Sequence, residues 1–279
     1  MNRQIQTVVH GKIDQSVEVR IQTWASQVLA RVDPSRLPLD LCVNIWANIE
    51  ELAAFYRQEK EALGVVTGEE TDFLATHEAW RGHPRIHICE ERVRHVSLDV
   101  VQGALHHEIG HALHHGSPEF YTFRFSGTLQ EAGRSCGLDL PLLQQCIYLL
   151  SIAIKDNDVV KWLAKVGFGF SQLALFRYLM SDTEEERQVW EVASNSAALR
   201  KITMAAFLKV LSPVETMIAV GMKDAPALKE QWKTAYQWLP KKECDQLCQF
   251  TKRTFEHDNK GFQDRLEKVA LELITLPDL

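Results

Sequence analysis

The chain has 279 residues, of which 46% are hydrophobic and 24% are charged, a composition that supports a folded core of ordinary size. Its formal charge of −6 at pH 7 argues against nucleic acids and anionic membrane surfaces as partners, because both are negatively charged. Residues 1–15 lack the apolar core of a secretory signal, and no apolar run approaches the roughly 18 residues that span a bilayer. We therefore expect a cytoplasmic protein whose six cysteines are reduced thiols.

Apolar periodicity predicts an alternation of helices and strands in the first half of the chain. We expect helices at residues 15–32, from Asn48 as N-cap to residue 63, and from Ser97 or Asp99 to His115. Strands are expected at residues 39–47, 73–80 and 84–92, with a loop at 64–72. Gly116 stands where a left-handed glycine would end the last of these helices.

From Leu140 onward the pattern is almost wholly helical, with expected helices at 141–166, 171–180, 184–211, 226–238 and from 241 to the last residues. The acidic run at 181–186 has the composition of a helix N-terminus. The sequence thus predicts an α+β protein. Residues 1–139 form an α/β part with a small mixed sheet, and residues 140–279 form a helical part that closes a site near the junction.

The segment Leu105–Gly116 holds five of the eleven histidines and one acid, Glu108. Residues four apart share a helical face, so His107 and His111 project one turn apart and can bind one Zn²⁺ together. Glu108 follows the first histidine and lies where a general base must lie to take a proton from a metal-bound water. No other register in the segment supplies two histidines and a base. The competing interpretation is a helix with surface histidines.

The pattern from His107 to His111 resembles the H-E-x-x-H signature of the zincin metallopeptidases. The resemblance covers about residues 75–166 and looks like a prokaryotic zincin-like group. It extends to residues 84–91, which are similar to the edge strand over the cleft of that fold. It implies a zincin-like fold and a zinc-dependent hydrolase of peptide-like amide bonds, with Glu108 as general base. A peptide or protein substrate would pair with the strand near Arg85 to Glu90.

A catalytically inactive zincin-like binding or regulatory protein is the alternative from a different class. Glu108 favours the enzyme, because a protein that has lost catalysis does not need the base. A closed structural zinc site is disfavoured, since such sites often use thiolates and no cysteine lies near this helix in sequence.

A catalytic zinc normally has three protein ligands, and two carboxylates compete for the third position. Asp156 is centred on the apolar stripe of the helix expected at 141–166, where an unpaired carboxylate is costly and a metal would neutralise it. Asp158, two residues on, is expected in solvent. Glu131 lies twenty residues after His111, a spacing similar to that of the thermolysin-like gluzincins.

Two features weaken Glu131. Its segment is rich in glycine and predicts a poor helix, and Ser135 stands where the gluzincins place an aspartate. The extended metzincin pattern is excluded, because His114 and Ser117 occupy the positions of its glycine and histidine. We therefore predict Asp156 as the third ligand, with Glu131 as the alternative.

The sequence also suggests a role or an exposure for four further residues near the motif. Tyr121 is a candidate hydrogen-bond donor to a developing oxyanion, although a packing role is favoured over that one. His114 is expected beside the ligands or at the surface, and His106 and His115 are expected to be exposed.

Overall fold

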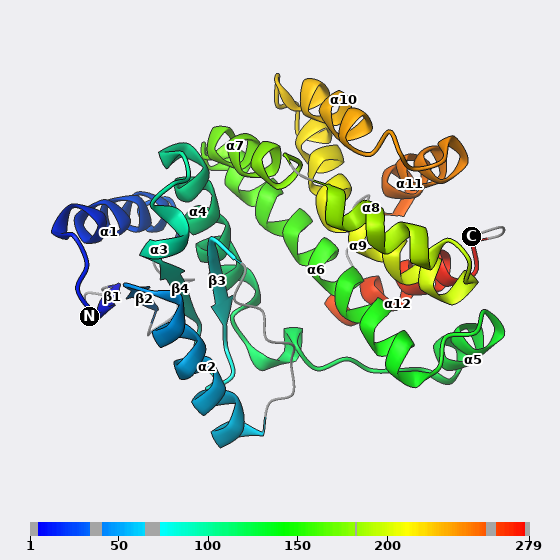
Figure 1. Cartoon of the computed structure of the whole chain (residues 1–279), viewed down its shortest axis with the longest axis horizontal. Coiled ribbons are helices and arrows are strands. Elements are labelled where there is room, and N and C mark those ends of the chain that lie inside the picture. Colours follow the sequence, from blue (N-terminus) through cyan, green and yellow to red (C-terminus); the bar gives the residue numbers. More distant parts are fainter. Residues whose placement is uncertain (1–4, 34–40, 65–72, 182, 255–260, 277–279) are drawn as a thin grey trace. The chain divides into compact units, whose positions relative to one another are not determined.

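The structure, a computed structural model, describes residues 5–33, 41–64, 73–181, 183–254 and 261–276 (Figure 1). The chain divides into two compact units. The first comprises Met1–Tyr121 and Val166–Leu175, and the second comprises Thr122–Lys165 and Phe176–Leu279. The first unit carries the sheet, and the described part of the second unit is helical, which gives the expected α+β class.

The first unit is built on a four-stranded mixed sheet of order β1-β2-β4-β3, with β1 at Gln6–His10, β2 at Cys42–Trp46, β3 at Ala75–Glu78 and β4 at Arg85–Cys89. Strands β1, β2 and β4 are parallel, and β3 is antiparallel to β4. The sequence did not predict β1. The expectation that residues 84–91 form an edge strand is wrong, because β4 pairs with β2 on one side and β3 on the other. Within the described residues, β3 is the edge on that side.

Local capping explains where the helices of the first unit begin. Asp14 accepts a hydrogen bond from the backbone N–H of Ser16 at the start of α1 (Gln15–Leu29), and Asn48 accepts one from Glu51 at the start of α2 (Ile49–Leu63). The short α3 spans Glu90–Val93. Helix α4 (Leu98–His115) packs against α1, β3 and β4, and the 3₁₀ turn η2 (Pro118–Phe120) follows it.

Gly116 ends α4 in a different way from the one predicted. Its φ is −78°, so it does not adopt the left-handed conformation. A Cβ at this position would lie 2.3 Å from the carbonyl oxygen of Ala112 and 3.0 Å from the side chain of Pro84. Glycine is therefore required here for close approach.

The second unit is organised around α9 (Ala197–Ala219), which contacts α6 (Leu140–Lys165), α8 (Glu184–Ala193), α10 (Ala225–Ala235), α11 (Lys241–Thr254) and α12 (Phe262–Ile274). Helix α7 (Gly169–Leu179) begins in the first unit and ends in the second. The acidic residues 184–186 lie in the first turn of α8, as expected.

Three expectations for the second unit are wrong. Helix α5 (Gly127–Ser135) forms where a poor helix was predicted, because Ser126 caps it by accepting from the N–H of Leu129. The helix expected at 184–211 is two helices, and Ser196 caps the second. The helix expected from 241 onward is also two, and residues 255–260 between them lie outside the described residues, as does most of the loop expected at 64–72.

One helix of the described residues, α9, is long and apolar enough to cross a membrane. Of its most apolar window, 61% is buried inside the protein. This burial and its contacts with five neighbouring helices are those of a core helix.

Candidate metal centre

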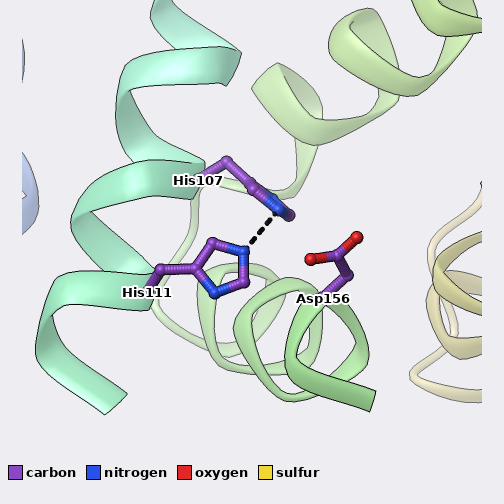
Figure 2. Close-up of side chains that lie close together, drawn as sticks. All are labelled: His107, His111 and Asp156. Atoms are coloured by element: carbon purple, nitrogen blue, oxygen red, sulfur yellow. Dashed lines mark hydrogen bonds between the residues drawn. The ribbon is translucent and has the colours of Figure 1, made fainter. Parts of the chain in front are cut away.

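Helix α4 presents the two predicted histidine ligands on one face. His107 and His111 are both buried, and their Nε2 atoms lie 3.0 Å apart (Figure 2). Two nitrogens, each about 2.0–2.1 Å from a tetrahedral zinc ion, lie about 3.3 Å from one another. The spacing in the protein is therefore close to the one that a shared zinc ion requires.

The orientation of His107 is fixed by Gln172, which the sequence analysis missed. The side-chain oxygen of Gln172 lies 3.0 Å from Nδ1 of His107, and its nitrogen donates to the carbonyl of Gly103 at 3.0 Å. An amide oxygen only accepts, so Nδ1 of His107 carries the proton. Nε2 of His107 is then left with the lone pair that a metal needs.

Gly103 allows Gln172 to reach this histidine. It lies one turn before His107 on α4, and a Cβ on it would lie 2.3 Å from the backbone oxygen of Ser171. Only glycine allows α4 and the start of α7 to approach this closely. The same contact places the hydroxyl of Ser171 3.1 Å from Nδ1 of His106.

The expectation that His106 and His115 are exposed is wrong, because both are buried. Helix α4 packs against α1, β3 and β4, so little of its circumference is left for solvent. Burial lowers the pKa of His106 to about 4, which keeps this imidazole neutral at pH 7. His115 packs edge-on against Phe120, and its Nδ1 lies 3.4 Å from Nδ1 of His111. His114 is partly buried.

His77 on β3 is the second functional residue that the sequence analysis missed. Its Nδ1 lies 2.7 Å from the Glu108 carboxylate, and its Nε2 lies 2.6 Å from the Tyr121 hydroxyl. An ionised carboxylate only accepts, so Nδ1 donates to Glu108, and Nε2 of a neutral ring accepts from Tyr121. The ring also stacks on His111, with centroids 4.6 Å apart and planes 7° from parallel. His77 thus connects the predicted base to Tyr121.

The two competing carboxylates have different surroundings in the second unit. Asp156 on α6 is 8% exposed, as its apolar stripe predicts, whereas Glu131 on α5 is exposed. Among the described residues, one group of three or more His, Cys, Asp or Glu side chains could hold a metal ion, namely His107, His111 and Asp156. One ligand atom from each of the three residues lies within 4.8 Å of the others.

Asp158 differs from its predicted role as a solvated acid. Its two carboxylate oxygens accept from the Arg265 guanidinium of α12 at 2.9 and 2.5 Å, and its side chain is 26% exposed. This bidentate ion pair is a structural contact between α6 and α12.

No family model, curated protein or solved structure matches this chain.

Proposed function

We propose that the chain binds a zinc ion through His107, His111 and Asp156 and hydrolyses peptide-like amide bonds with Glu108 as general base. The observation that carries this proposal is the pair of Nε2 atoms 3.0 Å apart, one of them on a ring whose tautomer Gln172 fixes. Three protein ligands of the His₂-carboxylate class leave one position open, as catalytic zinc sites require.

A bound zinc ion would polarise the substrate carbonyl and lower the pKa of its water. Glu108 directly follows the first ligand and would accept the proton of that water and pass it to the leaving amine. The hydrogen bond from His77 holds the Glu108 carboxylate at its Oε2 atom, 2.7 Å away, and leaves the other oxygen to take the proton. The hydroxyl of Tyr121 orients His77 in turn. These contacts position a base before substrate arrives.

The order of the sheet supports a proposal for the strand that would receive the substrate. Both sides of β4 are occupied, so the earlier expectation of pairing near Arg85 to Glu90 no longer holds. Strand β3 pairs with β4 on one side, and no other described strand pairs with it. An extended peptide would add to β3 by main-chain hydrogen bonds, beside the His77 side chain that contacts Glu108.

Elemental analysis of purified protein tests the metal and its third ligand together. We expect about one zinc per chain in the wild type and in Glu131→Ala, and loss of zinc from His111→Ala and Asp156→Ala. Cleavage of a random peptide library, read by mass spectrometry, should depend on that zinc and return when zinc is restored to chelated protein. Wild-type protein that takes up no zinc, or cleavage that survives complete chelation, would refute the proposal.

A further inference from the structure

The second unit contains a pocket of about 600 Å³ lined by residues of α6, α9, α11 and α12. This volume is within the range of small-molecule sites, about 300–1,000 Å³. Its apolar lining includes Ile154, Ile218 and Val269. A recess among helices of a bundle is a common place for a small ligand. None of these residues belongs to the proposed metal centre.

The charge of the pocket lining is opposite in sign to that of the chain. Four lysines line it, namely Lys161, Lys165, Lys252 and Lys268. Both acids of the lining have partners: Asp158 accepts from Arg265, and Glu215 accepts from Lys229. The lining thus concentrates positive charge on a protein whose formal charge is −6. Such a concentration attracts anions.

Asn157 supplies a second, independent observation. It lines the pocket and is 7% exposed, yet neither its side-chain oxygen nor its side-chain nitrogen has a hydrogen-bond partner. A buried amide without partners is destabilising, and such groups are rare in native proteins. Both polar atoms are themselves buried, so a bound molecule that accepts from the amide nitrogen and donates to its oxygen would remove that cost once the amide turns toward the recess.

We propose that this pocket binds a small organic anion. The lysines hold a phosphate or carboxylate head group, Asn157 meets a polar group of the body, and Ile154, Ile218 and Val269 contact its apolar part. Lysine ammonium groups are mobile point charges, so they accept either head group. The recess has the volume of a small-molecule site, whereas an extended polyanion needs a long basic stripe.

Isothermal titration calorimetry of the full chain with three probes tests this binding: phenyl phosphate, 3-phenylpropionate and the neutral 3-phenylpropan-1-ol. We expect at least one of the two anions to bind about tenfold or more tightly than the alcohol, and added salt to weaken that binding. The anion that binds more tightly identifies the head group. Equal affinity for all three probes, or no heat of binding from either anion, would overturn the proposal.

Matched variants locate the binding. Lys161→Glu combined with Lys165→Glu should weaken the anion by about tenfold or more, because attraction becomes repulsion at two positions. Lys223→Glu is the control, since Lys223 is an exposed lysine of the same unit outside the pocket lining. The zinc content of each variant is measured in parallel, so an anion held at the metal centre is recognised by its insensitivity to the lysine pair. That insensitivity would also refute the pocket as the binding site.

Discussion

Two buried amide side chains, Gln172 in the first unit and Asn157 in the second, have opposite surroundings. Gln172 is fully buried and both ends of its amide are hydrogen bonded, one to His107 and one to the carbonyl of Gly103. Asn157 is 7% exposed and neither end has a partner. An amide with hydrogen bonds at both ends fixes the geometry of its neighbour in advance. A buried amide without hydrogen-bond partners marks a place where the folded chain lacks a hydrogen-bonding group.

The difference extends to the groups around each amide. In the first unit, Tyr121, His77 and Glu108 form a connected chain of hydrogen bonds, and the two Nε2 atoms of His107 and His111 face one another. In the second unit, lysines line a pocket whose two acids already have partners. The first arrangement holds a few atoms in place for a small cation. The second offers charge without fixed geometry, which suits a larger and more variable anion.

The largest expected effect is at Glu108, where the hydrogen-bond chain of the first unit ends. Glu108→Gln keeps the size of the side chain but cannot accept a proton, so turnover should fall by about 10²–10⁴-fold. Zinc content, measured on the same preparation, should match the wild type because Glu108 is not a ligand. Wild-type turnover from a fully zinc-loaded Glu108→Gln protein would exclude Glu108 as the general base.

The next largest effect is expected when the two hydrogen bonds of the Gln172 side chain are removed. Gln172→Leu leaves the N–H of His107 and the carbonyl of Gly103 without their buried partner, and the ring is no longer held in one tautomer. Loss of such an outer contact typically costs about 10–100-fold in metal affinity. A competitive zinc titration against a fluorescent chelator measures the change, and Gln231→Leu, a substitution of the same type in α10, is the matched control. Unchanged zinc affinity in Gln172→Leu would show that Gln172 does not orient the ligand.

A smaller effect tests how the first unit brings Gln172 to His107. Gly103→Ala places a Cβ 2.3 Å from the backbone oxygen of Ser171, and backbone atoms cannot move aside easily. We expect a loss of about 1–3 kcal/mol in unfolding free energy, as for other overpacked sites, despite the better helix propensity of alanine. Gly127→Ala in α5 is the control, because a Cβ there meets nothing within 4 Å. Urea denaturation of both variants decides the matter, and equal stability would contradict the close approach.

The sequence predicted those parts of the fold whose signals are local. Asn48 before α2 is a strong N-cap, and the apolar period of α6 runs almost without interruption, so both helices were found within a few residues of their ends. Strand β1 was missed because an edge strand with little burial shows no apolar alternation. The break between α8 and α9 was missed because apolar periodicity continues on both sides of Ser196.

The candidate site shows the same division between local and long-range information. The spacing of His107, Glu108 and His111 is contained in five residues, so the sequence alone indicates it. Gln172 reaches His107 across 65 residues, and no local pattern predicts that contact. His77 did carry a weak signal, since it shares the strand face of Ala75, and Ala79, two residues beyond it and just past the end of β3, is also buried. A histidine between two buried small residues indicates a polar partner in the core.

The smallest expected effect is at Asn157, whose amide has no hydrogen-bond partner. Asn157→Leu is the counterpart of Gln172→Leu. Asn157→Leu replaces a buried amide that has no partner with an apolar side chain of similar size, so no hydrogen bond is lost and a desolvation cost disappears. The melting temperature of the ligand-free protein should stay within about 2 °C of the wild type or rise, whereas Gln172→Leu should lower it. The affinity for 3-(4-hydroxyphenyl)propionate, an anion whose phenol hydroxyl can both donate and accept, should fall in the same Asn157→Leu protein, because that hydroxyl then faces a methyl group. Natural proteins retain such a destabilising residue where binding requires it. An Asn157→Leu protein that gains stability and keeps full affinity for the anion would therefore show that Asn157 does not contact the ligand.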